Sequence, residues 1–325
     1  MDFLLFLQNF RESSNGLFTA FFQKATFFGE LNTVLVLLAI VYWCIDKETG
    51  RFLMTGWCWN RLLNGFLKIT ACIYRPWISD PRIVPDASAV STATGYSFPS
   101  GHATNAGSFF GGIAIKKKGE VKTSLRVLCI IIVLCNVFSR LYLGVHTPLD
   151  VFVGLGASVA VMFLCRIVLD RTKDKKNADI VVAAICVVIG IAIAIYASVK
   201  SYPVDYDAEG KLLVDGHKMA ADSFKGVGWN LGFFIGAIIE RRYVHFTSDG
   251  TMQERAVRLV GGLLGFYIVN LIVCNVLKLF ITGNIATILT SFLQMFYIVL
   301  VFPWIISLTQ KENRAKSREE LKAQA

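Results

Sequence analysis

Long apolar stretches alternate with short polar or basic connections over most of the chain. A helix needs about 20 predominantly apolar residues to cross the hydrocarbon core of a bilayer. Stretches approaching this length lie at residues 29–45, 52–74, 99–115, 122–143, 148–169, 178–199, 226–242, 257–280 and 284–309. The pattern therefore predicts an all-α, polytopic transmembrane helical bundle of about nine spans.

The apolar pattern also divides the chain into four segments. Residues 1–28 mix Phe and Leu with polar residues, which favours an amphipathic segment in the membrane interface over a short extra span. We expect residues 29–175 to form the core that carries the chemistry and residues 176–309 to add further transmembrane helices. Residues 310–325 read as a charged cytoplasmic tail.

The connections between spans differ in basic residues, and this difference predicts the orientation. One set of connections, together with the tail, is rich in Lys and Arg, for example at 116–122, 171–176 and 241–255. Cytoplasmic loops collect such residues, so this set faces the cytoplasm. The alternate connections at 75–98 and 200–225 then face outside, with an outside N-terminus and an inside C-terminus.

Composition supports a membrane protein. Hydrophobic residues make up 54% of the chain and charged residues 17%, and the mean hydropathy is +0.55. The net charge of +10 follows from the basic cytoplasmic loops, so nucleic-acid binding is not expected. Most of the eight cysteines fall inside apolar stretches and read as small buried hydrophobes. The tryptophans at span ends fit interfacial belts: Trp43, Trp77, Trp229 and Trp304.

Two cations stand near the outer end of the second span. Lys68 and Arg75 are seven residues apart, which is two helical turns, so they share a face. A charged residue within a span is costly and therefore points to a functional site. The simpler alternative is a lysine that extends to the interface and an arginine at the boundary.

The next span opens with Pro99, Ser100, Gly101 and His102. Proline suits the first turn of a helix, and Ser and Gly leave backbone N–H groups accessible. The positive end of the helix dipole favours an anion there, so this helix start predicts a phosphate cradle. A plain helix start with an interfacial histidine is the alternative.

A third group of polar residues spans the connection after residue 143. Arg140 lies at the outer end of one span, and His146 and Asp150 begin the next one four residues apart. A carboxylate at this spacing can orient the imidazole, and an arginine can bind phosphate oxygens in a bidentate manner. A helix cap or a surface pair is the simpler interpretation of such a His/Asp pair.

All three groups fall on the same outer side by the loop pattern. Without a function, three cations, two histidines and a carboxylate would cost free energy in so apolar a chain. Their convergence favours a single oxyanion site. A transporter would need charged residues near the middle of the membrane, whereas these residues lie at span ends.

The three segments resemble the signature of the type 2 phosphatidic acid phosphatase and vanadium haloperoxidase superfamily. That signature reads Lys-x6-Arg-Pro, then Pro-Ser-Gly-His, then Ser-Arg-x5-His-x3-Asp. This sequence matches every defined position in order, within residues 50–170. Three coupled motifs are far more specific than any one of them.

The resemblance implies a role for each matched residue. His146 would attack phosphorus and Asp150 would orient it, while His102 would protonate the leaving group. The phosphoryl oxygens would be bound by the remaining matched residues: Lys68, Arg75, Ser100, Gly101 and Arg140. The cations would supply the charge stabilisation, so no metal and no cofactor are expected.

Several substrates fit such a site. We expect hydrolysis of a lipid phosphate or a polyprenyl diphosphate such as undecaprenyl diphosphate, with membrane lipids as the surrounding partners. A soluble phosphate ester, as in the glucose-6-phosphatase branch, or transfer of the phosphoryl group to an acceptor hydroxyl are the alternatives. The expected location is a bacterial plasma membrane, with the active site on the extracytoplasmic side and substrate choice in 77–98 and 200–225.

Overall fold

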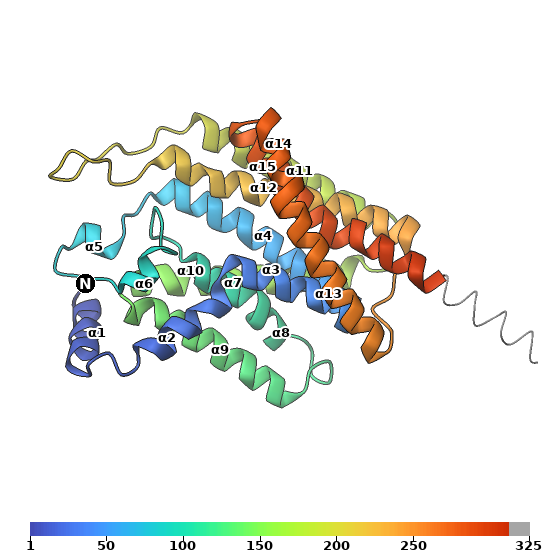
Figure 1. Cartoon of the computed structure of the whole chain (residues 1–325), viewed down its shortest axis with the longest axis horizontal. Coiled ribbons are helices and arrows are strands. Elements are labelled where there is room, and N and C mark those ends of the chain that lie inside the picture. The colour runs from blue at the N-terminus through green and yellow to red at the C-terminus, as the bar shows by residue number, and fades with distance from the viewer. Residues whose placement is uncertain (312–325) are drawn as a thin grey trace, which may run out of the picture. The chain divides into compact units, whose positions relative to one another are not determined.

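A computed structural model describes residues 1–311 of the chain, and the charged tail from residue 312 onward lies outside these described residues (Figure 1). The described chain is helical, with two isolated bridges and no longer strand. Its first helices are α1 (Asp2–Ser13), α2 (Thr19–Thr26), η1 (Phe27–Gly29), α3 (Leu31–Ile40), η2 (Val41–Ile45), α4 (Lys47–Ala71), α5 (Pro76–Ser79) and α6 (Ala87–Val90). The middle of the chain holds α7 (Gly101–Ala106), η3 (Gly107–Gly111), α8 (Gly112–Ala114), α9 (Thr123–Tyr142) and α10 (Pro148–Thr172). The remaining helices are α11 (Ala178–Val199), α12 (Gly216–Ile239), η4 (Glu240–Val244), α13 (Met252–Ile268), η5 (Val269–Val273), α14 (Cys274–Phe280), α15 (Gly283–Phe296) and η6 (Tyr297–Val301).

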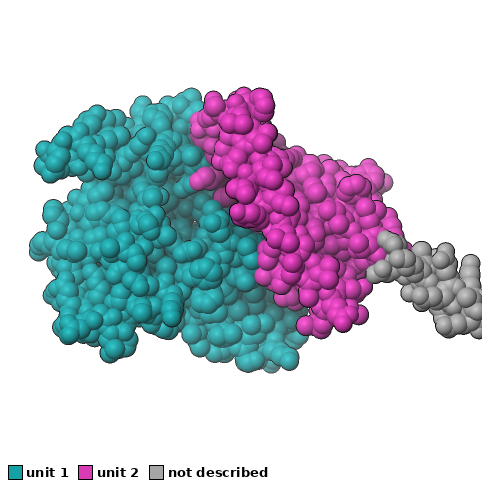
Figure 2. Space-filling view, in the orientation of Figure 1, with its two compact units in different colours: residues 1–37, 52–171, 191–223 teal, residues 38–51, 172–190, 224–325 magenta. Residues whose placement is uncertain are grey.

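The chain divides into two compact units (Figure 2). The first unit holds residues 1–37, 52–171 and 191–223, and the second holds residues 38–51, 172–190 and 224–325. All three sequence motifs belong to the first unit.

Polar side chains join α4 to its neighbours inside the first unit. Asn64 Nδ2 donates to the Thr104 hydroxyl at 3.0 Å, and Trp57 Nε1 donates to Asn105 Oδ1 at 3.2 Å. Asn60 Nδ2 donates to the Ser158 carbonyl of α10 at 3.2 Å. Because buried polar groups need partners, these bonds fix α4 against the helix that begins at the second motif.

The N-terminal segment packs onto the same unit. Helix α2 lies along α9, and η1 contacts α7 (Figure 1). From α1, Arg11 donates to the carbonyls of Tyr142 and Val84 at 3.1 and 2.6 Å. Residues 1–28 therefore contact the segment that carries the third motif.

The second unit has its own core. Trp43 is fully buried against Phe302, and its indole N–H donates to the Ile298 carbonyl at 2.8 Å. Trp229 is 2% exposed and donates to Gln294 Oε1 at 3.0 Å. The expected place of these two tryptophans in an interfacial belt is wrong, because both indoles find their partners inside the protein.

Five described helices are long and apolar enough to cross a membrane, or six if the pair Thr19–Gly29 and Leu31–Ile45, bent by 56°, forms one span. The five are Thr123–Tyr142, Pro148–Thr172, Ala178–Val199, Met252–Phe280 and Gly283–Lys311. The expected spans at 52–74, 99–115 and 226–242 are helical but are not among them. Part of the reason is that α4 carries polar residues that face its neighbours in the bundle, which lowers its mean hydropathy.

Candidate active site

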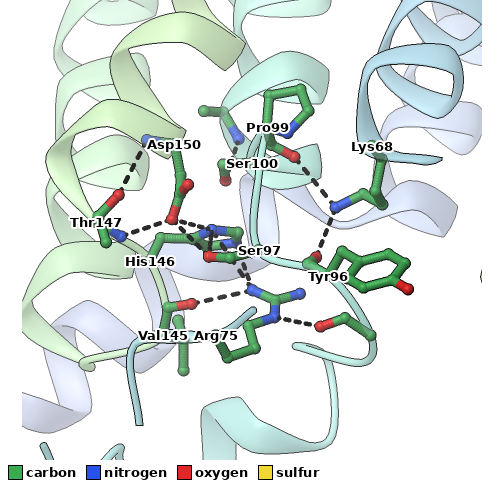
Figure 3. Close-up of polar contacts among 12 residues, drawn as sticks. Lys68, Arg75, Tyr96, Ser97, Pro99, Ser100, Val145, His146, Thr147 and Asp150 are labelled. Atoms are coloured by element: carbon green, nitrogen blue, oxygen red, sulfur yellow. Dashed lines mark hydrogen bonds and ion pairs between the residues drawn. The ribbon is translucent and has the colours of Figure 1, made fainter. Parts of the chain in front are cut away.

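His146 lies in the short connection between α9 and α10 and is 2% exposed (Figure 3). Its Nδ1 faces the Ser97 hydroxyl at 3.3 Å and Asp150 Oδ2 at 3.4 Å. The Ser97 hydroxyl donates to the same Asp150 oxygen at 2.5 Å, and the Thr147 N–H donates to it at 2.7 Å. The carboxylate therefore orients the imidazole both directly and through a serine.

Arg75 contacts the other face of the imidazole. It caps the short helix α5 after the backbone leaves α4, and its Nη1 lies 2.9 Å from His146 Nε2. The guanidinium also donates to the carbonyls of Thr94, Gly95 and Val145, each at 3.0 Å. Three backbone bonds hold this cation beside the histidine.

The tautomer of His146 follows from these contacts. Arg75 Nη1 lies 2.9 Å from Nε2 and 3.4 Å from Nδ1, so this contact does not distinguish the two nitrogens. The Asp150 carboxylate can only accept and the Ser97 hydroxyl donates its proton to Asp150, so the ring proton lies on Nδ1. Nδ1–H then points toward the Ser97 hydroxyl and the Asp150 carboxylate. The electron pair of the neutral ring is therefore on Nε2, the ring nitrogen nearer to the Arg75 cation.

Lys68 and Ser100 form the next part of the site (Figure 3). Lys68 lies in the last turn of α4, and its Nζ donates to the carbonyls of Tyr96 and Pro99 at 2.9 and 3.2 Å. Ser100 caps α7: its hydroxyl accepts from the Ala103 N–H, and its own N–H donates to the Asp150 carbonyl at 2.9 Å. The Pro99–His102 motif is thereby bonded to Lys68 of the first motif and to Asp150 of the third.

Two side chains of the site keep buried donors or acceptors without partners. Arg140 is fully buried, and its Nη1 donates to the Thr26 hydroxyl at 2.5 Å. Its Nε and Nη2, and Nε2 of His102, have no hydrogen-bond partner among the described residues. Unpaired buried polar groups are costly, and a bound oxyanion would satisfy the two arginine donors.

Electrostatics link these groups into one site. His102 interacts with Arg140, His146, Arg75 and Lys68. Burial lowers the pKa of His146 well below its ordinary value of 6.5, and the charges of Arg75, Arg140 and Lys68 lower it further. Burial likewise lowers the pKa of Arg75 to about 10, which leaves its guanidinium charged at neutral pH. His146 is therefore neutral and surrounded by cations.

The structure thus brings the eight residues singled out in the sequence to one place in the first unit. Their positions are Lys68, Arg75, Ser100, Gly101, His102, Arg140, His146 and Asp150. Two further residues of the site were not predicted from the sequence: Ser97, which bridges His146 and Asp150, and Thr26, which contacts Arg140. For Ser97, the only sequence feature that pointed to the site was its closeness to the second motif. For Thr26, no sequence feature pointed to the site.

Within residues 1–311 no group of three or more His, Cys, Asp or Glu side chains is placed to hold a metal ion. The donors that face the candidate site are instead cations and N–H groups, which match the oxygens of a phosphoryl group.

Comparisons with known proteins agree with these motifs. Residues 50–174 match the PAP2 superfamily, and residues 224–314 match the transmembrane extension of PAP2 superfamily phosphatases. A dihydrosphingosine 1-phosphate phosphatase of Saccharomyces cerevisiae is 28% identical over 45% of this chain and 37% of its own length. Phosphatidylglycerophosphatase B of Bacillus subtilis is 31% identical over 42% of this chain and 66% of its own length. No solved structure matches the chain.

The matched residues include all three motifs. The first family match contains Lys68, Arg75, the 100–102 helix start, Arg140 and the His146–Asp150 pair. The second family match begins at residue 224, which is also where the chain passes from the first unit into the second within α12. Because the two matches together cover more than half of the 325 residues, the chain belongs to the PAP2 superfamily, with the transmembrane extension of its phosphatases.

Proposed function

We propose that this protein is an integral membrane phosphatase that hydrolyses a lipid phosphate through a phosphohistidine at residue 146. The observation that carries the proposal is the neutral His146 imidazole with its Nε2 lone pair beside Arg75, close to the unpaired donors of Arg140. A nucleophile surrounded by cations is the arrangement that phosphoryl transfer requires.

The first chemical step forms the phosphohistidine. His146 Nε2 attacks phosphorus, and the bond between phosphorus and the lipid oxygen breaks. His102 donates a proton to the departing alkoxide, and the negative phosphoryl group beside it favours its protonated form. Asp150 and Ser97 stabilise the positive charge that develops on the imidazole ring.

The second step restores the enzyme. Water attacks phosphorus, gives its proton to His102, and the bond between phosphorus and Nε2 breaks to release inorganic phosphate. Lys68, Arg75 and Arg140 neutralise the phosphoryl oxygens in both steps, together with the N–H groups at the start of α7. Each step leaves His102 in the protonation state that the next one needs.

A lipid monoester is the substrate class that we favour. Both relatives are named for lipid phosphates, a sphingoid phosphate and a phosphatidylglycerol phosphate. In addition, Leu149 and Phe152 flank the catalytic Asp150 on α10 and are 60% and 64% exposed. An apolar surface at the level of the reacting group would contact the chains of a lipid whose head group enters the site.

We further propose that α4, the α7–α8 segment and α12 cross the membrane with the five apolar helices and the bent N-terminal pair, which gives nine spans. The polar side chains of α4 have partners in α7 and α10, so its burial in a bundle does not leave them unsatisfied. The basic connections then face the cytoplasm, and the site opens toward the outer side.

The test is release of inorganic phosphate by the purified protein in detergent. The panel contains a sphingoid phosphate, phosphatidylglycerol phosphate, phosphatidic acid, a polyprenyl diphosphate and a sugar phosphate, each with and without EDTA. We expect a lipid monoester to give the highest kcat/KM and EDTA to leave it unchanged. A preference for the sugar phosphate would move the protein to soluble substrates, and phosphate release only after an acceptor alcohol is added would indicate a transferase.

A further inference from the structure

Thr26 connects the N-terminal segment to a cation of the site. Its hydroxyl accepts a hydrogen bond of 2.5 Å from Nη1 of Arg140, and both side chains are buried, at 8% and 0% exposure. Thr26 ends α2, far outside the residues 50–174 that match the superfamily. Glu30, four residues later, also interacts electrostatically with Arg140.

The backbone around Thr26 is fixed by α7 and α9. Asn136 Nδ2 donates to the carbonyls of Ala25 and Thr26, each at 3.1 Å, and Asn105 Nδ2 donates to the Gly29 carbonyl at 2.9 Å. A Cβ on Gly29 would lie 2.8 Å from the His102 carbonyl, so only glycine allows this approach. Residues 25–29, which end just before the bend between Gly29 and Leu31, are therefore held against α7 and α9, which carry parts of the second and third motifs.

The contact with Thr26 determines which donors of Arg140 remain available. Nη1 is occupied, whereas Nε and Nη2 are buried and have no hydrogen-bond partner within residues 1–311. These two N–H groups lie on one edge of the guanidinium and point in parallel, which is the fork that binds two oxygens of a phosphate. The Thr26 hydroxyl, by accepting from Nη1, thus orients the Nε–H and Nη2–H groups of Arg140 toward the site.

We propose that Thr26 is a positioning residue for the phosphatase reaction: it holds the Arg140 guanidinium so that its Nε and Nη2 edge faces the phosphoryl oxygens. This inference rests on the proposed function, because it assigns Arg140 to the substrate's phosphoryl group. It makes the bent N-terminal segment a part of the active site rather than only a membrane-interface element.

The test compares Thr26→Val, which removes the acceptor but keeps the shape, with Thr26→Ser, which restores a hydroxyl. Thr19→Val is the matched control, because the Thr19 hydroxyl contacts the Tyr142 hydroxyl of the same helix α9 at 3.2 Å but touches no cation of the site. The readouts are orthovanadate affinity, measured by calorimetry, and kcat/KM for phosphate release. A hydrogen bond to a charged group predicts a loss of about 10- to 100-fold in both for Thr26→Val.

We expect Thr26→Ser to recover most of both values and Thr19→Val to stay within about threefold of the unmodified protein. Unchanged vanadate affinity in a folded Thr26→Val protein overturns the role of Thr26 but leaves the proposed function intact. If that variant does not fold, Thr26→Ala replaces it, with the same loss expected. An unmodified protein that neither binds vanadate nor releases phosphate overturns both proposals.

Discussion

The two histidines of the site differ in their surroundings, and this difference assigns their roles. His146 is oriented by Asp150 and Ser97, which hold the ring proton on Nδ1 and leave the electron pair on Nε2 beside Arg75. His102 keeps an unpaired Nε2 among the cations. The first fits a nucleophile, and the second fits a group that gives and takes a proton.

Replacing His102 by alanine should lower kcat by about 10²- to 10⁴-fold for a lipid phosphate, the usual contribution of a general acid. An aryl phosphate with a good leaving group needs no proton in the first step, so the same variant should still release the aryl alcohol in a rapid burst, although the second step stays slow. His146→Ala should abolish the burst and the turnover. Equal losses in the rate of leaving-group release for both substrates in His102→Ala would remove this residue as the acid.

The acid limb of kcat/KM should lie below pH 6.5. Burial lowers the pKa of His146 well below its ordinary value of 6.5, and Arg75, Arg140 and Lys68 add to the effect. Since the proposed mechanism uses the neutral ring as the nucleophile, activity should persist as the pH falls through 6.5 and be lost near the lowered pKa. The stability that this group contributes is present above pH 6.5 and is lost on acidification from there, because the unfolded chain then binds the extra proton.

The limb should be measured with two substrates whose phosphate groups ionise at different pH values. A limb common to both belongs to the free enzyme rather than to a substrate. A common limb centred at or above pH 6.5 would contradict the neutral, cation-surrounded imidazole.

At the scale of elements, the packing of α10 against the start of α7 sets the geometry of the site. A Cβ on Gly154 would lie 2.8 Å from the Ser100 carbonyl and 3.3 Å from the Ser100 nitrogen. The same backbone nitrogen donates to the Asp150 carbonyl. A side chain at residue 154 must therefore push the helix start away from Asp150 and His146.

Gly154→Ala should destabilise the protein by about 1–3 kcal/mol, the usual effect of overpacking, and should reduce kcat/KM. Gly156→Ala is the matched control, because nothing lies within 4 Å of a Cβ at that position of the same helix. Thermal unfolding in detergent and phosphate release check both variants. If the two variants have the same unfolding temperature and the same rate of phosphate release, α10 can shift at residue 154 without disturbing the site.

The elements also show how far the sequence predicts this fold. Each motif is a local pattern, and the loop pattern put all three motifs on the same side, so the sequence predicted that Lys68, Arg75 and the His146–Asp150 pair share one site. Ser97 and Thr26 escaped prediction because their bonds join residues 53 and 114 positions apart, and no local pattern records such a pair. Trp43 was misplaced because a large aromatic near a span end suits both an interface and a core.

At the scale of the whole molecule, the proposed orientation can be tested with single cysteines. Ser91 and Lys118 are both exposed and lie on opposite sides in the proposed topology. In intact cells, an impermeant thiol reagent should label Ser91→Cys and not Lys118→Cys, with the chain that carries only its eight native cysteines as background. The reverse labelling would place the site on the cytoplasmic side.

Orthovanadate and EDTA distinguish the proposed chemistry from metal-dependent hydrolysis. Vanadate becomes five-coordinate when His146 Nε2 binds it, and its equatorial oxygens resemble the charge distribution of phosphoryl transfer. Vanadate should therefore inhibit, and Arg140→Ala should weaken both inhibition and turnover. Complete loss of activity in EDTA that magnesium restores would point to a metal-dependent reaction instead.

The covalent intermediate is the centre of this account, and its direct detection is the decisive measurement. The protein is mixed with a lipid phosphate, quenched in alkali within one turnover, digested and examined by mass spectrometry. His102→Ala mixed with an aryl phosphate serves as the variant in which only the second step is slowed. The account predicts a phosphoryl group on the peptide that contains His146, attached to the imidazole and absent from His146→Ala. Phosphate released at full rate with no modified peptide, or a phosphoryl group on another residue, would contradict it.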